Sequence, residues 1–329
     1  MGWCMPGRVV YFNGEFVSEQ EARVSIFDSA LMFGDMAFEM TRTYGQKPFR
    51  LQEHLDRLYA SLRLLEIDCG ISQQEMEQLT LRTLEMNLAT ELEDVDWQIM
   101  HDISRGPLPI YETAFPDGLQ PTVSINCWPL ITHMGGFSGN YDEGVHLFLP
   151  SQLAVPAQLV DPKAKTRSRL HYQLAVLQGT RAGERKWPLM MDPDGYLAEG
   201  PGWNVFLVKD GVLHTPEPRN ILRGVSRGMV LDLASQLGIE ARESNLGRYE
   251  ALQADELFCT ATTYGMVHAA SFEGQQVEDG QAGPVFQAIL EAWIDNVGVD
   301  FVQQAHDYKD RLPAWCEAER GQATSLAPQ

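Results

Sequence analysis

The sequence lacks several features, and each absence removes a class of proteins from consideration. No apolar stretch approaches the roughly 20 residues of a membrane-spanning helix, and the N-terminus has no basic segment followed by an apolar run. Positive charge is scarce too, because 25 basic residues against 45 acidic ones give a formal net charge of −20. Such a field repels phosphate backbones and anionic lipid surfaces. We therefore expect a cytoplasmic protein with no nucleic-acid or membrane partner.

Cysteine is also scarce, and its spacing excludes two further classes. The five cysteines are Cys4, Cys69, Cys127, Cys259 and Cys316, with no CxxC pair among them. An odd, scattered set fits neither a disulfide framework nor a zinc cage. The histidines form no HExxH motif, and His54 beside an apolar stripe is expected to be a packed or surface side chain. We predict reduced, mostly buried thiols and no metal site.

Lysine is scarce enough to limit any chemistry that needs a primary amine. The six lysines are Lys47, Lys163, Lys165, Lys186, Lys209 and Lys309. The first and fifth lie at predicted hairpin turns and the last lies in a polar C-terminal segment, where a solvated charge is expected. An enzyme that bonds a cofactor through an imine would use one of the other three, and composition does not choose among them.

Turn signals and apolar spacing predict the secondary structure. Asn13-Gly14 predicts a hairpin between residues 8–12 and 15–17, and similar signals occur at Gly45, Gly195 and Gly211. Leucines recur with helical spacing between Leu51 and Leu65, and a second helix is predicted from about Val225 to Leu237, ended by Gly238. Hairpins followed by helices, twice over, predict an α+β chain of two domains.

Composition also suggests where the domains end. Residues 132–144 are rich in glycine but lack a Walker lysine, which favours a flexible interdomain loop over a phosphate-binding nest. We predict an N-terminal α/β domain over residues 1–133, an interdomain loop over 134–143 and a C-terminal domain over 144–308. The polar segment 309–329 is predicted to be a loosely held tail.

Ten short motifs occur in a fixed order between about residues 9 and 270. They are Tyr11–Gly14, Phe33–Asp35, Phe38–Glu39, Phe49–Leu58, Gly195–Gly200, Asn204–Phe206, Asp210–Leu213, Thr215–Pro216, Ile221–Arg227 and Asp255–Phe258. This ordered set resembles the fold-type IV (class IV) aminotransferases that depend on pyridoxal 5′-phosphate (PLP), a family that includes the branched-chain and D-amino-acid aminotransferases and the (R)-amine transaminases.

The resemblance implies an architecture and an activity. It implies the two-domain α+β fold of D-amino-acid aminotransferase type, a homodimer, and PLP in the interdomain cleft, bound as an imine to Lys165 or, less favoured, Lys163. The implied reaction moves an amino group from a branched-chain or aromatic amino acid, or a primary amine, to a 2-oxo acid. Two alternatives stay open: a lyase of the aminodeoxychorismate lyase type, and a non-catalytic PLP-binding protein.

The resemblance also assigns the groups around the cofactor. Glu199 would keep the pyridine nitrogen protonated, and Arg57 would form paired hydrogen bonds to the phosphate. The backbone amides of Val225 and Ser226, at a helix start, would complete the phosphate site together with the Thr262 hydroxyl.

One cofactor contact departs from the family spacing. The family tyrosine that bonds the cofactor's phenolic oxygen commonly follows the lysine by five residues, where this chain has Leu170. Tyr172 is the candidate if two residues are inserted after Lys165.

Substrate contacts follow from the same resemblance. Phe38 would line the pocket, and Thr263 is a further candidate for binding substrate. Arg105 would pair with a substrate carboxylate, with a structural arginine at a turn as the equal alternative. The D-amino-acid enzymes have an arginine and a histidine where this chain has Ile110 and Glu112, which argues against that activity.

Overall fold

The chain forms two compact units in the computed structural model, which describes residues 7–89, 94–183 and 185–325. The first unit comprises residues 1–135, 164–168 and 306–329, and the second comprises residues 136–163 and 169–305. Residues 164–168, which lie inside the predicted C-terminal domain, thus group with the N-terminal part of the chain. The predicted α+β character is present in both units.

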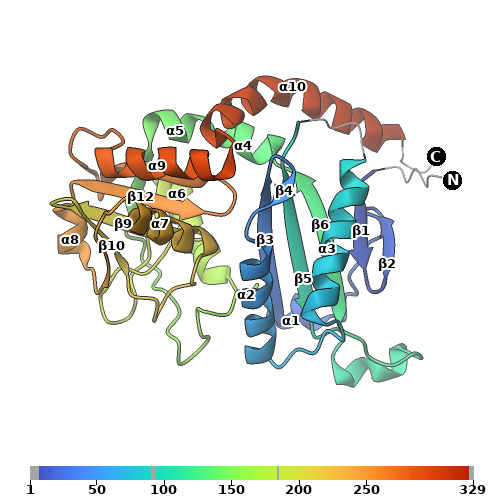
Figure 1. Ribbon diagram of the computed structural model, residues 1–329. Helices are drawn as coiled ribbons and strands as arrows, with labels where there is room; N and C mark the ends of the chain where they lie inside the picture. Colours follow the sequence, from blue (N-terminus) through green and yellow to red (C-terminus); the bar gives the residue numbers. More distant parts are fainter. Residues whose placement is uncertain (1–6, 90–93, 184, 326–329) are drawn as a thin grey trace. The chain divides into compact units, whose positions relative to one another are not determined.

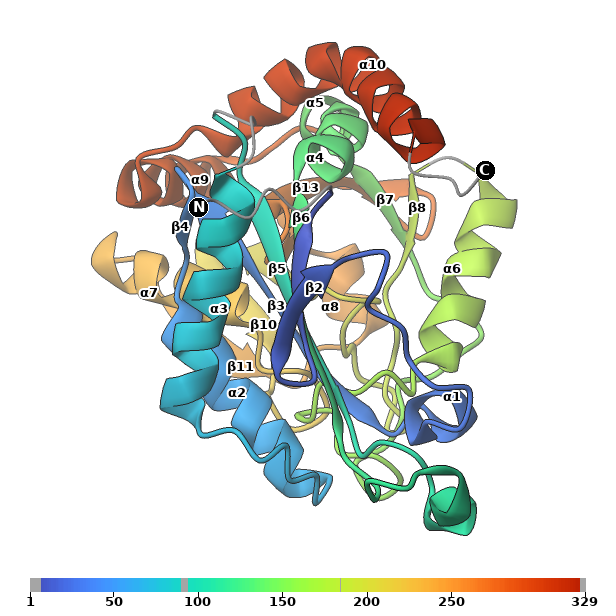
Figure 2. The same ribbon diagram turned by 90° about the vertical axis from the view of Figure 1, so that its right-hand side faces the viewer.

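The first unit is built on an antiparallel sheet of six strands in the order β2-β1-β6-β5-β3-β4 (Figure 1). The strands are β1 Val9–Phe12, β2 Glu15–Ser18, β3 Met36–Tyr44, β4 Lys47–Pro48, β5 Trp97–Ser104 and β6 Thr122–Pro129. The helices are α1 Ser29–Phe33, α2 Leu51–Leu64, α3 Gln73–Leu88, the 3-10 helix η1 Pro109–Ala114 and α4 Ile131–Phe137. Figure 2 shows α2 and α3 side by side along the sheet.

Local sequence signals explain this unit well. Asn13 and Gly14 adopt positive φ angles of 49° and 98° in the tight turn between β1 and β2, as predicted. The predicted leucine stripe forms the buried face of α2, where Leu55 and Leu58 are fully buried against strand residues such as Trp97. Burial of two leucine side chains contributes about 3–6 kcal/mol.

The second unit holds a mixed sheet in the order β11-β10-β9-β12-β13-β7-β8, with β14 paired to β13. Its strands are β7 Val145–Phe148, β8 Lys186–Pro188, β9 Asn204–Lys209, β10 Val212–Pro216, β11 Ala241–Ser244, β12 Glu256–Ala261, β13 Gly265–Phe272 and β14 Gln275–Gln276. Its helices are α5 Gly139–Glu143, α6 Leu170–Ala182, α7 Val225–Gln236, α8 Arg248–Leu252, α9 Pro284–Val297 and the start of α10 Phe301–Ser325. Helix α7 begins where it was predicted and packs against α9 and β12.

Two segments predicted to be irregular are helical. The glycine-rich segment 132–144 falls largely within α4 and α5 and is not a flexible loop. Glycine there serves close packing, because a Cβ at Gly135 would lie 3.0 Å from backbone atoms of Tyr308 and Lys309. The predicted tail also continues α10 as far as Ser325, and the buried Tyr308 hydroxyl accepts a hydrogen bond of 2.7 Å from the Asp96 amide.

The described cysteines agree with the predicted free thiols. Cys69, Cys127 and Cys259 are buried and Cys316 is half-buried, whereas Cys4 lies outside the described residues. Within residues 7–89, 94–183 and 185–325, none of the helices is both long enough and apolar enough to cross a membrane.

Candidate active site

The segment that carries Lys165 is an extended addition to strand β3 of the first unit. The Phe38 amide donates to the Lys165 carbonyl at 2.9 Å, and the Arg167 amide donates to the Met36 carbonyl at 3.2 Å. Thr166 forms an antiparallel bridge with Ala37 between these two hydrogen bonds. The backbone of the segment is therefore fixed by the sheet and does not behave as a loop.

The Lys165 side chain lies over an aromatic ring. Its Nζ is 4.7 Å from the centre of the buried Phe38 ring, and its backbone amide donates to the Ser61 hydroxyl of α2 at 3.1 Å. Lys163, the other lysine of this segment, forms an ion pair of 2.9 Å with Asp161 in the second unit. This pairing is that of an ordinary surface lysine.

Arg57 is held by a buried carboxylate in the first unit. Its Nε donates to Glu39 Oε2 at 2.8 Å and its Nη2 donates to Glu39 Oε1 at 2.7 Å, a paired arrangement with strong directional preference. Glu39 is fully buried and also accepts from His54 Nδ1 at 3.1 Å. The predicted packed histidine is thus one partner of Glu39. The other partner is Arg57, whose guanidinium is oriented by Glu39.

The charge state of this cluster follows from its contacts. Burial alone would raise the pKa of Glu39, but the Arg57 guanidinium and the His54 hydrogen bond together hold that pKa well below its ordinary value. Burial lowers the pKa of His54, so the imidazole is neutral near neutral pH. Because an ionised carboxylate can only accept, the proton of His54 is on Nδ1.

A second buried histidine makes this unit sensitive to acid. Burial lowers the pKa of His101 from 6.5 to about 4, and its Nε2 is 2.8 Å from the Thr80 hydroxyl. Below pH 6.5 the unfolded chain binds the proton and the folded chain does not, so stability is lost as pH falls from 6.5 towards 4. This group alone is expected to remove about 2 kcal/mol from the free energy of unfolding between pH 7 and pH 5.

Urea unfolding of the wild type and of His101→Gln at these two pH values measures that loss. The variant is expected to lose about 2 kcal/mol less than the wild type between pH 7 and pH 5. An equal loss in the two proteins would contradict the assignment.

Glu199 forms the centre of a hydrogen-bonded group in the second unit. Its Oε1 accepts from the Tyr172 hydroxyl at 2.7 Å, and its Oε2 accepts from Asn204 Nδ2 at 3.1 Å and from the Leu222 amide at 3.0 Å. Glu199 is only 6% exposed. Because both carboxylate oxygens accept hydrogen bonds, the orientation of this negatively charged group is fixed.

The position of Tyr172 bears on the irregular spacing after Lys165. Helix α6 begins at Leu170 and places the Tyr172 hydroxyl on Glu199. Burial and the neighbouring Glu199 carboxylate raise the pKa of Tyr172 well above 10, so the phenol keeps its proton and donates. A tyrosine does stand beside the predicted glutamate; its contact with a cofactor oxygen stays a prediction.

The start of α7 is the helix N-terminus that was predicted to bind an anion. Gly224 precedes the helix without a side-chain cap, and the first-turn residues Val225 and Ser226 are buried. A Cβ at position 224 would lie 2.1 Å from Asn204 Oδ1, so only glycine fits this contact. Thr262, the predicted hydroxyl, is half-buried in the turn between β12 and β13, and Thr263 follows it.

Arg105 makes contacts of the kind expected for a structural arginine at a turn. Its Nε and Nη2 donate to the Asp35 carboxylate at 2.8 and 3.2 Å, and its Nη1 and Nη2 donate to the Glu66 and Leu65 carbonyls at 2.7 Å. These contacts tie the end of α2 to the Asp35 turn. A role in binding substrate stays a prediction.

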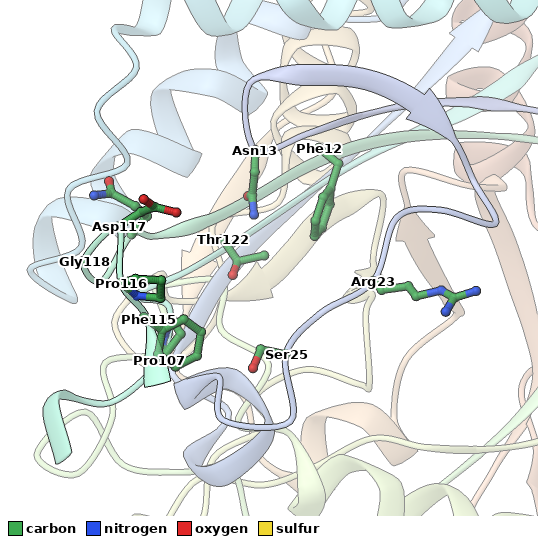
Figure 3. Close-up of a pocket in the computed structure, with 11 residues that line it drawn as sticks. Phe12, Asn13, Arg23, Ser25, Pro107, Phe115, Pro116, Asp117, Gly118 and Thr122 are labelled. Carbon is green, nitrogen blue, oxygen red and sulfur yellow. The ribbon is translucent and has the colours of Figure 1, made fainter. Parts of the chain in front are cut away.

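The first unit also has a hollow that none of the predicted cofactor or substrate residues lines. Its volume is about 280 Å³, and Phe12, Phe115 and Thr122 are among its lining residues (Figure 3). The Arg23 side chain points away from the other labelled side chains. This hollow is therefore separate from the predicted site residues, which are grouped here by their chemistry.

Sequence reasoning missed several contacts of this site. Glu39 and Asn204 were quoted only as motif residues, and Ser61 and Arg167 were given no role. Glu39, Ser61 and Arg167 act through partners distant in sequence, for example Glu39 through Arg57, whereas Asn204 donates to Glu199 five positions away. A polar residue in a strand otherwise buried, such as Glu39 in β3, is the one signal that points to such a partner.

Comparison with known proteins supports the same family as the motifs. The amino-transferase class IV family model matches residues 36–272. The chain is 33% identical to a putative branched-chain-amino-acid aminotransferase of Methanocaldococcus jannaschii over 287 residues, which cover 87% of this chain and 95% of that protein.

Comparison with solved structures indicates the same family. The branched-chain amino acid aminotransferase of Escherichia coli matches with a TM-score of 0.77 at 29% identity, covering 88% of this chain and 93% of that one. The enzyme of Thermoproteus uzoniensis, solved with norvaline, matches with a TM-score of 0.77 at 27% identity, covering 92% and 97%.

The chain therefore belongs to the class IV aminotransferase family. It is a fold-type IV transaminase whose cofactor is PLP, as the ordered motifs predicted. Each unit by itself contains groups whose chemistry suits that cofactor. The first has a lysine over Phe38 and an arginine oriented by Glu39, and the second has a buried, hydrogen-bonded carboxylate and a helix start without a side-chain cap.

Proposed function

We propose that this enzyme transfers the amino group of a branched-chain L-amino acid to a 2-oxo acid, using Lys165 as its reactive amine. The observation that carries the proposal is the placement of Lys165 on an extended segment bonded to β3, with its Nζ over Phe38. An apolar ring beside the amine suits an aliphatic substrate side chain. The names of the related proteins support the same substrate class.

Each candidate residue has a task that its contacts support. PLP, when bound, supplies an aldehyde for the amine and a ring that withdraws electrons from the substrate Cα. Lys165 would carry a proton between the substrate Cα and C4′ of the cofactor. Glu199 holds a proton on the pyridine nitrogen, and Tyr172 donates from its hydroxyl. Arg57, oriented by Glu39, binds phosphate oxygens.

The amides of Val225 and Ser226 and the Thr262 hydroxyl complete the phosphate contacts in this proposal. Val225 and Ser226 lie in the first turn of α7, where the helix dipole favours an anion. Thr263 and Phe38 are assigned to the substrate.

We also propose that the enzyme is a homodimer. The first unit exposes large apolar side chains on and near α1 and η1, including Ile26 at 72%, Phe33 at 67% and Ile110 at 76%. The two segments are packed together through Phe27 and Tyr111, whose ring centres are 4.7 Å apart. An apolar surface of this kind favours a protein partner. Light scattering at micromolar concentration should give twice the chain mass of 36.9 kDa.

The activity is tested with purified protein saturated with PLP. We expect a visible absorption band that is bleached by leucine, isoleucine or valine and restored by 2-oxoglutarate or pyruvate. Repeated turnover should require both the amino donor and the 2-oxo acid acceptor, because the cofactor returns to its starting form only through the second half of the reaction. Aminodeoxychorismate is the comparison substrate: release of pyruvate from it without an acceptor, together with no bleaching by the three amino acids, would indicate a lyase and would contradict the proposal.

A further inference from the structure

Arg167 shares the face of the extended segment that carries Lys165. An isolated bridge between Thr166 and Ala37, with one backbone hydrogen bond on either side of it, pairs residues 165–167 with β3. In extended backbone, side chains two positions apart point to the same side. Both side chains indeed reach the same ring: the Arg167 Cζ lies 3.9 Å, and the Lys165 Nζ 4.7 Å, from the centre of Phe38.

The contacts of Arg167 orient its guanidinium without using all its donors. Nε and Nη2 donate to the same oxygen, Asp102 Oδ1, at 3.2 and 2.8 Å, and Nη2 also lies 2.9 Å from Met100 Sδ. In the part of the chain that the structure describes, no acceptor is recorded for its Nη1. The side chain is 36% exposed, so a small anion can approach it.

Arg105 differs from Arg167 in this respect. Three of its nitrogens already donate to Asp35 or to the Leu65 and Glu66 carbonyls, and breaking those bonds would free the end of α2. Of the two arginines, Arg167 is therefore the one that can bind a further carboxylate without breaking its existing hydrogen bonds.

We infer that Arg167 binds the carboxylate of the amino donor and of the 2-oxo acid, and so selects carboxylate-bearing substrates. The inference rests on the proposed function, since it takes Lys165 as the reactive amine. A planar guanidinium held by Asp102 and by the Phe38 face loses little side-chain freedom when it binds, which favours affinity. Its charge and paired N–H groups match a carboxylate better than those of a lysine.

Binding is measured with 4-methylpentanoate, which is leucine without its amino group, and with the uncharged amide of the same acid. For the PLP-saturated protein, Arg167→Gln is expected to raise the dissociation constant of the acid about 10- to 100-fold in calorimetry, because a hydrogen bond to a charged group is lost. The constant for the amide is expected to change less than about threefold. Arg82→Gln, which removes an exposed arginine of α3 that pairs with Glu85, is the control and should leave both constants within about threefold of the wild type.

The kinetic constants give a second readout. Arg167→Gln should raise the KM of leucine about 10- to 100-fold, with a much smaller change in kcat. If the wild type turns over leucine and Arg167→Gln leaves the KM and acid binding unchanged, Arg167 is not the carboxylate residue although the proposed function stands. If the wild type shows no amino transfer but the variant still weakens acid binding selectively, the proposed function fails and the role of Arg167 stands.

Discussion

Replacement of Lys165 by alanine is expected to lower the kcat of amino transfer at least about 1,000-fold, because the amine serves both as covalent anchor and as proton carrier. The backbone hydrogen bonds of the segment do not involve the side chain, so the fold should be kept. Stopped-flow measurement of the half-reaction with leucine, together with the visible absorption band of the bound cofactor, gives the two quantities that should be lost.

Lys163→Ala is the matched control for this experiment. Lys163 lies two positions earlier, and its Nζ pairs with Asp161 at 2.9 Å. Loss of an exposed ion pair costs little, so both turnover and the absorption band should stay within about twofold of the wild type. If Lys163→Ala abolishes the band and Lys165→Ala keeps it, the choice of lysine is wrong.

Glu199→Gln is expected to lower kcat about 100-fold or more, the range found when a preorganised charge is removed from an active site. Glutamine keeps the size of the side chain but cannot hold a proton on the pyridine nitrogen. If the glutamine amide nitrogen replaced Oε2, its N–H groups would face the donors Asn204 Nδ2 and the Leu222 amide, and those hydrogen bonds would be lost. Single-turnover rates with leucine measure the chemical step, and circular dichroism checks the fold.

Glu256→Gln provides the comparison for Glu199→Gln. Glu256 is a second buried glutamate of the same unit, and its oxygens accept from the Val285 and Phe286 amides at the start of α9, at 2.9 and 2.8 Å. This variant should lose about 1–2 kcal/mol of unfolding free energy with little change in kcat. Equal losses of kcat in the two variants would show that Glu199 acts only through stability.

The sequence predicts those parts of the fold that depend on local physics. The leucines of α2, the Asn13-Gly14 turn and the start of α7 after Gly224 were all predicted from spacing and turn chemistry. The ordered motifs also indicated the family, because their joint spacing is far more specific than any one of them.

What the sequence could not predict depends on partners that are distant in the chain. The glycine at position 135 indicated flexibility by composition, yet it packs tightly against the backbone near Tyr308. The contacts of Glu39 with Arg57 and of Arg105 with Asp35 join residues 18 and 70 positions apart. A charged residue such as Glu39 in a buried strand signals that a partner exists, but not which residue it is. The roles of these charges become visible only when the strands are paired.

The backbone bonds between β3 and residues 165–167 bear on how freely the side chains of this segment can change. Main-chain hydrogen bonds are indifferent to side-chain identity, so Lys165 keeps its place whatever residues surround it. Ser168 is held as well, because its hydroxyl donates to the Phe33 and Gly34 carbonyls. Substitution of Arg167 would therefore change the charge beside the Phe38 ring without displacing Lys165, so charge at this position can evolve separately from the position of the amine.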